Sequence, residues 1–164
     1  MSTQAPSLRV DGLVERPTTL GFADFEGFPE ADQVRDVSRF HASRRGDAVT
    51  LESVLRRVAP APTANYVTLH AARDDFHVSV PLDAVRAEGL IVYKVGEGPL
   101  DVSQGGPIRF LIKDPDLCHT SELDDCANVK YLDRIEFAER KGRDTRPQDE
   151  AAHEALHAKE AHSD

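Results

Sequence analysis

The sequence contains few cysteines and no long apolar run. Cys118 and Cys126 are its two cysteines, too few for a disulfide framework, although one bridge between them stays open. The longest apolar runs, such as Leu90–Tyr93, fall far short of the roughly 20 residues that cross a bilayer. Residues 1–10 also lack the apolar segment of a secretion signal. We therefore expect a cytoplasmic protein that does not enter the membrane.

An excess of positive charge and several catalytic signatures are missing as well. The chain carries 29 acidic and 20 basic residues, a net charge of -9 that disfavours binding to nucleic acids and anionic membranes. It contains no phosphate-binding P-loop, no dinucleotide-binding G-x-G-x-x-G and no Ser-His-Asp triad. These absences make hydrolase, nucleotidase and nicotinamide-enzyme functions poor explanations of the sequence.

The N-terminal third predicts a strand, a short helix and a longer helix. Residues 8–14 alternate as an edge strand would, and Pro17 precedes a predicted helix start at Thr18. After Thr50, a suitable N-cap, apolar residues recur with the i, i+3, i+4, i+7 spacing of a helix. These residues are Leu51, Val54, Leu55 and Val58. Prolines at 60 and 62 end this helix.

The rest of the chain predicts further strands and a polar tail. Residues 66–72 and 76–80 indicate a hairpin, and Pro81 begins a helical turn that ends at Gly89. Buried strands are expected at 90–95 and 108–112. We expect one α+β domain over 8–140 with mixed β-sheets and short helices, between a flexible segment 1–7 and a helical or disordered tail 141–164. The cysteines lie in a predicted polar loop.

The segment around Gly105 and Gly106 is the most informative stretch. Two glycines before a proline permit unusual backbone angles and close approach to a ligand, and Arg109 can grip an anion with two N–H groups. Lys130 adds a second positive charge if the fold brings it alongside. The alternative is a tight turn into a strand, with both cations in ordinary surface pairs. The first interpretation predicts a site for a phosphate or pyrophosphate group.

At these residues the chain resembles the sulfite oxidase family of molybdopterin enzymes. That family commonly shows N-G-x-x-L-P-x-x-H-G-x-P-x-R, a hydrophobic strand and then K-W-L, which Leu100, Gly105, Pro107, Arg109 and Lys130-Tyr131-Leu132 resemble. Other similar segments are Leu8 to Pro17 (opening strand), Asp24-Phe25 (first short helix), Val49 to Leu55 (G-V-x-L-x-x-L-L helix) and Asp75 to Leu82 (hairpin). The resemblance spans about residues 8–137 and implies a fold like the sulfite oxidase catalytic domain, in a shortened form.

The resemblance implies molybdopterin as cofactor, with Gly105, Gly106, Arg109 and Lys130 as contacts. Family members bind molybdenum through a cysteine shortly before the G-V-x-L-x-x-L-L helix, and a soft thiolate suits that metal. Residues 36–41 contain no cysteine, and Ser38 or a neighbour stands near that position. The chain also has Gly96 in place of the family's asparagine and Gln104 in place of a frequent histidine. No metal ligand is assigned.

Three functions therefore remain open. The chain is either a molybdopterin-binding domain with oxidoreductase activity and an unidentified electron acceptor, or a cofactor-free relative that acts as a binding or interaction module. In the third alternative, Cys118 or Cys126 supplies a substitute thiolate, forms a bridge or binds a metal; otherwise both are ordinary thiols. Neither the substrate nor a catalytic residue follows from the sequence.

Several histidines match simple patterns without their context. Residues 153–157 spell the H-E-x-x-H motif of zinc proteases, but they lie in the polar tail and lack a third ligand at the required spacing. We expect His41, His70 and His77 to be half-buried polar residues rather than metal ligands. Arg44 and Arg45 predict a solvated turn, with anion binding left open.

Overall fold

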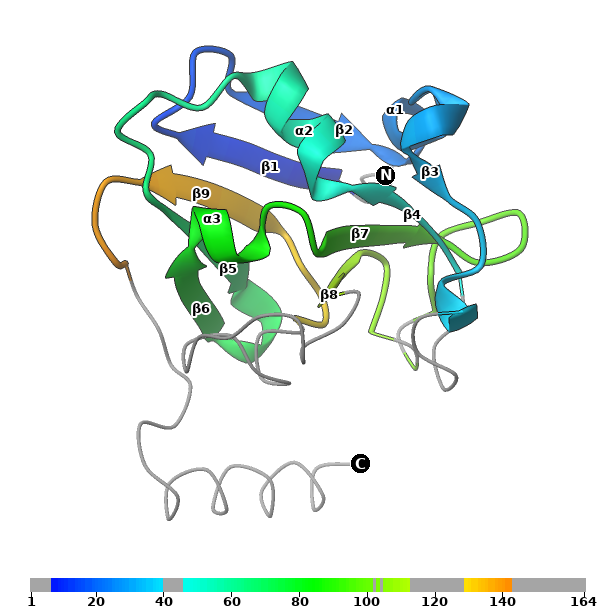
Figure 1. The fold of residues 1–164 in the computed structure, drawn as a ribbon. Coiled ribbons are helices and arrows are strands. Elements are labelled where there is room, and N and C mark those ends of the chain that lie inside the picture. The colour runs from blue at the N-terminus through cyan, green and yellow to red at the C-terminus, as the bar shows by residue number, and fades with distance from the viewer. Residues whose placement is uncertain (1–6, 40–45, 102, 104, 113–128, 143–164) are drawn as a thin grey trace, which may run out of the picture.

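The computed structural model describes residues 7–39, 46–101, 103, 105–112 and 129–142. Its strands form two sheets, shown in Figure 1. The five-stranded sheet has the order β2 (Thr18–Gly21), β1 (Ser7–Gly12), β9 (Arg134–Ala138), β5 (Tyr66–Ala71) and β6 (Phe76–Pro81). The four-stranded sheet has the order β3 (Gln33–Val34), β4 (Asp47–Thr50), β7 (Gly89–Lys94) and β8 (Arg109–Ile112).

Three short α-helices connect these strands. They are α1 (Phe22–Glu26), α2 (Leu51–Val58) and α3 (Leu82–Val85). Figure 1 shows α2 and α3 in front of the five-stranded sheet. Mixed sheets with a few short helices confirm the predicted α+β class. In the part of the chain that the structure describes, no helix has the length and apolar character needed to cross a membrane.

Two local predictions from sequence are confirmed. The helix that follows Thr50 spans Leu51–Val58, and the Thr50 side chain accepts a hydrogen bond from the Ser53 amide at 3.2 Å, as an N-cap does. The predicted hairpin is the antiparallel pair β5 and β6, in which Leu69 lies opposite Val78. Both elements are encoded by neighbouring residues, so the local pattern is sufficient to predict them.

Two other predictions are wrong in detail. Residues 18–21 form strand β2, and helix α1 begins only at Phe22. The reason is that β2 pairs with β1, where Thr18 lies opposite Val10, and β-branched threonines fit a strand. In addition, β1 is not an edge strand, because β9 pairs with it in parallel on its other side. That partner comes from the far end of the chain, which no local alternation reveals.

The four-stranded sheet is buried on both faces. Its inner face contributes Val49, Ile91 and Phe110 to the main core, which the five-stranded sheet and the helices complete. Its outer face carries a separate cluster of Val34, Val37, Ala48, Leu90, Val92, Leu100 and Leu111. Side chains alternate between the faces of a strand, so the outer face is where β8 presents Arg109 together with Leu111. The candidate site lies on this outer face.

Several predictions fall outside the described residues. They concern the flexible N-terminal segment up to residue 6, the loop that contains Cys118 and Cys126, the turn with His41, Arg44 and Arg45, and the tail from 143 onward. The position of Gln104 and the H-E-x-x-H motif at 153–157 belong to the same group. These statements, and the domain limits drawn from them, stay predictions.

Candidate anion-binding site

Arg109 is the first residue of β8 and is almost completely buried. Its relative exposure is 4%, although arginine is seldom buried in proteins. It lies opposite Val92, which in turn lies opposite Ala48, so a row of side chains crosses the outer face from β4 to β8. The guanidinium group is thus held against a rigid apolar surface. An arginine in such a position is preorganised to bind an anion with its N–H groups.

Gly105 and Gly106 are fixed by close contacts that exclude side chains. Gly105 has φ of +88°, and a Cβ added there would lie 3.0 Å from Nη1 of Arg109 and 3.0 Å from Cγ of Lys130. A Cβ on Gly106 would lie 2.2 Å from the Leu100 carbonyl oxygen. Gly106 is joined to Pro107 by a cis peptide bond. Gly106 is therefore required by space, and Gly105 is favoured by its backbone angle.

Lys130 reaches Gly105 from a distant part of the sequence. The Tyr131 amide donates a hydrogen bond to the Gly105 carbonyl at 2.8 Å, and the Leu132 amide donates one to Ile108 at 2.8 Å. Tyr131 has φ of +56°, an unusual angle for a bulky residue, which requires support from its surroundings. The Arg73 guanidinium lies 4.4 Å from the centre of the Tyr131 ring and supplies part of that support.

Arg109 and Lys130 thus approach the same glycine, Arg109 with its guanidinium Nη1 and Lys130 with the aliphatic base of its side chain. Arg109 comes from β8 and is buried, whereas Lys130 comes from the segment before β9 and is exposed. The absence of a side chain at Gly105 allows Arg109 and Lys130 to approach its Cα closely. Such an arrangement favours a compact anion with several acceptor oxygens, such as a phosphate group.

Ser38 lies in a short 3-10 turn, Val37–Arg39, and its polar groups are engaged. Its hydroxyl donates a hydrogen bond to Oδ1 of Asp36 at 2.6 Å, and its amide donates to the same oxygen at 3.1 Å. Asp36 has φ of +63°, and its own amide donates to Oδ1 of Asp47 at 3.0 Å. The Asp36 carboxylate therefore holds the hydroxyl at this position.

Ser38 and the glycine segment lie toward the same face of the four-stranded sheet. Val37, which precedes Ser38, belongs to the outer cluster together with Leu100. Leu100 in turn contacts Gly106 so closely that only glycine fits there. The outer cluster therefore connects the turn that carries Ser38 with the segment that carries Gly105 and Gly106.

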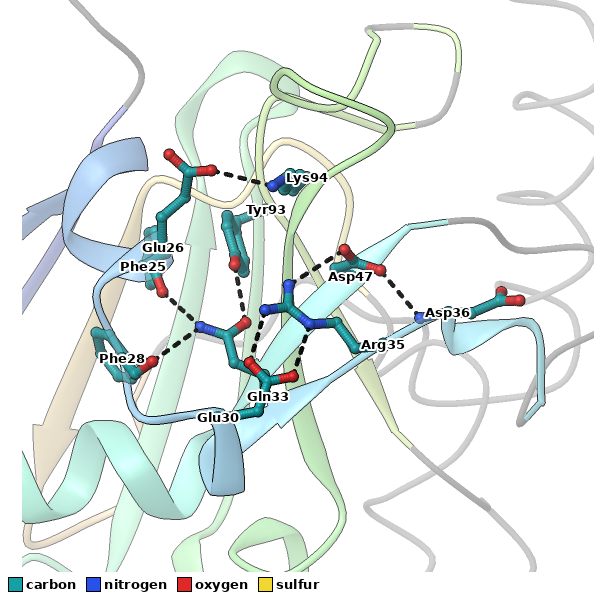
Figure 2. Close-up of polar contacts among 10 residues, drawn as sticks. All are labelled: Phe25, Glu26, Phe28, Glu30, Gln33, Arg35, Asp36, Asp47, Tyr93 and Lys94. Atoms are coloured by element: carbon teal, nitrogen blue, oxygen red, sulfur yellow. Dashed lines mark hydrogen bonds and ion pairs between the residues drawn. The ribbon is translucent and has the colours of Figure 1, made fainter.

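A network of polar side chains connects the segment before the Val37–Arg39 turn to neighbouring strands, as Figure 2 shows. Arg35 contacts Glu30 at 2.9 Å and Asp47 at 3.4 Å, which links the chain before Ser38 to β4. The hydrogen bond and charge of Arg35 lower the pKa of Glu30 below its usual value. Sequence reasoning missed Arg35, Asp36 and Asp47, because ordinary charged residues become a network only when β3 pairs with β4.

Behind this network, a buried polar group fastens α1 to the sheet. Gln33 donates from Nε2 to the carbonyls of Phe25 at 2.8 Å and Phe28 at 3.3 Å, and its Oε1 accepts from the Tyr93 hydroxyl at 2.8 Å (Figure 2). Burial raises the pKa of Tyr93. An adjoining shallow hollow, lined by Phe22, Tyr93, Pro99 and Pro107, is apolar and too narrow for a water molecule. It offers no second ligand site among the described residues.

No metal cluster is apparent in the described part of the chain. Within the described ranges, no group of three or more His, Cys, Asp or Glu side chains is placed to hold a metal ion. His70 and His77 lie opposite each other on β5 and β6 of the five-stranded sheet, whereas Arg109 lies on β8 of the four-stranded sheet.

Comparison with known proteins places the chain in a family. No curated protein matches the chain. Among solved structures, the sulfane dehydrogenase SoxCD from Paracoccus pantotrophus is similar, with a TM-score of 0.58 and 18% sequence identity. The match covers 82% of this chain but 38% of the SoxCD chain, so this chain corresponds to a part of that protein. The profile of the oxidoreductase molybdopterin binding domain matches residues 2–145, and the chain belongs to that family.

Proposed function

We propose that the chain binds molybdopterin through its phosphate, at the site formed by Gly105, Gly106, Arg109 and Lys130. The observation that carries the proposal is that the buried Arg109 and the distant Lys130 both approach Gly105, a glycine with a φ of +88°. Family membership supplies the identity of the ligand. An oxidoreductase role, an unidentified electron acceptor and a cytoplasmic location form the further part of this proposal.

The residues present fit the phosphate end of this cofactor. The space at Gly105 is bordered by Nη1 of Arg109 and the side chain of Lys130, and a Cβ would fill it. Phosphate oxygens pair well with a guanidinium fork and with a lysine ammonium group. The backbone of the site is held by the hydrogen bond between Tyr131 and Gly105, so little ordering would be needed on binding.

The residues present do not fit a metal at the position of Ser38. A hydroxyl is a far poorer ligand than the thiolate that the family uses, and this hydroxyl already donates to Asp36 at 2.6 Å. When a molybdopterin cofactor is bound, its metal supplies redox chemistry that side chains lack, while the protein supplies binding and electrostatics. We therefore assign these residues binding roles alone.

Each residue has a distinct part in the proposed binding. Arg109 would donate two hydrogen bonds from a fixed, buried position, whereas Lys130 would contribute a mobile charge at the rim. Gly105 and Gly106 would let the backbone approach the ligand. Arg73 stacks on Tyr131, the residue after Lys130, and so would help to position the backbone of Lys130.

The direct test is cofactor content. The full chain would be produced in cells that synthesise the molybdenum cofactor, purified, and measured for molybdenum by elemental analysis and for pterin by fluorescence after oxidation. We expect pterin in the wild-type chain and about tenfold less in Arg109→Ala, because hydrogen bonds to a charged group contribute about 1.5–3 kcal/mol. Arg109→Lys keeps the charge but loses the fork and is expected to recover only part of the occupancy.

Matched controls separate a specific loss from a general one. Arg140→Ala removes an exposed arginine outside the site and should leave the pterin content unchanged. Thermal unfolding of each variant would show whether the fold is intact. Wild-type protein from competent cells that contains no pterin would refute the proposal, as would unchanged occupancy in a folded Arg109→Ala variant.

The second candidate function is a cofactor-free interaction module. The engagement of the Ser38 hydroxyl by Asp36 favours it, because the position that corresponds to the family's metal ligand is occupied by an internal hydrogen bond. This candidate predicts neither pterin nor molybdenum in the purified chain. Pterin without molybdenum would instead support phosphate binding while excluding metal binding.

A further inference from the structure

His70 and His77 form a closely paired set of rings that the proposed function does not use. They lie directly opposite each other on β5 and β6, and their Nδ1 atoms are 2.7 Å apart. Nε2 of His70 lies 3.0 Å from Oε1 of Glu136 on β9, and Nε2 of His77 lies 2.9 Å from Oδ1 of Asp75. The two imidazoles thus form a continuous chain between two carboxylates.

The hydrogen-bond chemistry of these contacts favours one positive charge on the pair. A carboxylate only accepts hydrogen bonds, so each Nε2 must carry a proton. The contact between the two Nδ1 atoms needs one further proton, because two lone pairs repel and two N–H groups clash. Three protons on two imidazoles leave a single positive charge, since a neutral histidine carries one proton.

The surroundings favour this charge. The side chains of His70 and His77 are 14% and 10% exposed, so water does little to screen the contacts. Glu136 also contacts the cationic Arg134 at 3.5 Å, and Asp75 is 72% exposed to water. Two anions therefore enclose one shared cation.

Among the described residues, the other charged groups near the pair contact other partners. Arg134 contacts Asp11 of β1 at 2.9 Å, and Arg73 stacks on Tyr131. The Asp133 carboxylate accepts a hydrogen bond from the Ala72 amide at 2.9 Å. Further along β5 and β6 the neighbours are Thr68 and Ser79, which do not titrate, and the Gly142 amide donates to Ser79 at 2.8 Å.

We propose that His70 and His77 form a proton-binding site that holds a single proton between them and joins β5, β6 and β9 while that proton is present. Loss of the proton leaves two facing lone pairs, and a second proton leaves two facing N–H groups. Either change breaks the contact between the rings. The join is therefore strongest in an intermediate pH range and weakens on both the acidic and the alkaline side.

Nuclear magnetic resonance of the 15N-labelled full chain tests the proton count. Imidazole nitrogen signals of His70 and His77 would be assigned with His70→Asn and His77→Asn and followed over pH, with the five other histidines as internal references. We expect the pair to titrate in two separate, mutually dependent steps, with three N–H protons between the steps. In His70→Asn, His77 should titrate in one step. Independent single steps that ignore the loss of the partner would overturn the proposal.

A double-mutant cycle tests whether the contact between His70 and His77 stabilises the fold. Unfolding by denaturant would be measured for the wild type, both single Asn variants and the double variant at several pH values. We expect coupling of about tenfold in the folding equilibrium in the intermediate range, and less coupling at either side. Coupling that is constant with pH would contradict the shared proton.

Two further variants keep the test decisive if an Asn variant does not fold. Glu136→Gln retains an acceptor for His70 but removes the negative charge, so the intermediate charged state should cover a narrower pH range in the NMR titration. Glu52→Gln removes a carboxylate from the exposed pair with Arg86 and should leave the titration unchanged. Equal effects of the two variants would refute the role of Glu136.

Discussion

The outer faces of the two sheets treat charge in opposite ways. On the five-stranded sheet, positive and negative side chains alternate along β1 and β9, and Arg134 of β9 forms ion pairs with Asp11 of β1 and with Glu136 of its own strand. On the four-stranded sheet, Arg109 and Lys130 approach the same glycine. The first face pairs opposite charges with one another, whereas the described residues of the second bring two basic side chains to one glycine. The difference in the sign of neighbouring charges is what the proposed anion site rests on.

The largest effect is expected at the glycine segment of the second face. Gly106→Ala should destabilise the fold by about 3 kcal/mol or more, because the new Cβ would lie 2.2 Å from a backbone oxygen of Leu100. Thermal unfolding measures the loss. Gly98→Ala is the matched control, since no atom lies within 4 Å of the added Cβ there. Equal stability of the two variants would show that the segment is not packed as described.

The two cations should contribute unequally to anion binding. In titrations with inorganic pyrophosphate, Arg109→Ala should weaken binding about tenfold or more, and Lys130→Ala by about threefold, because exposed charges are screened by water. Added salt should reduce the Lys130 contribution more strongly. Equal losses, with equal salt dependence, would contradict the distinction between a buried and an exposed cation.

The support of Tyr131 by Arg73 should have a smaller effect. Arg73→Ala removes a guanidinium that lies 4.4 Å from the ring centre, and we expect a loss of about 1 kcal/mol in the free energy of unfolding. Arg73→Lys should retain part of it. Denaturant unfolding distinguishes the two, and a stability equal to the wild type in both variants would show that the stacking contributes nothing.

The smallest effect is expected for the pH dependence of stability, through Asp11 on the five-stranded sheet. Burial by itself raises the pKa of Asp11, but hydrogen bonds and charges from Arg134 and Arg9 outweigh it, so the pKa lies below the usual 3.8. The resulting stabilisation is present above pH 3.8 and is lost as pH falls through the lowered pKa. Asp11→Asn should cost about 0.5 kcal/mol at neutral pH, a small value because the group is near the surface. Unfolding at pH 7 and pH 2 should show the difference disappearing in acid.

Much of the local structure could be predicted from sequence. The helix capped by Thr50 and the hairpin of β5 and β6 depend on residues within a few positions of one another. The strand at 18–21 could not be predicted, because its pairing with β1 overrides the local preference for a helix start after Pro17. The same limit applied to β1, whose parallel partner β9 lies more than 120 residues along the chain.

In the candidate site, too, some residues could be predicted from the sequence and others could not. The glycines and the cations at 109 and 130 are visible in sequence as residues suited to an anion, and their resemblance to the family is carried by spacing. Arg35, Asp36 and Asp47, which hold the turn of Ser38, have no motif that distinguishes them from other surface charges. Their roles arise from the pairing of β3 with β4.

The sequence by itself determined the mixed α+β class, the helix after Thr50, the hairpin of β5 and β6 and the residue types of the candidate site, because each depends on short-range pattern or composition. Only the tertiary structure decided that β9 lies between β1 and β5, that Lys130 reaches Gly105, and that His70 contacts Glu136 of β9. The physical reason is that such contacts join segments far apart in the chain, and their stability depends on the packing of the whole domain.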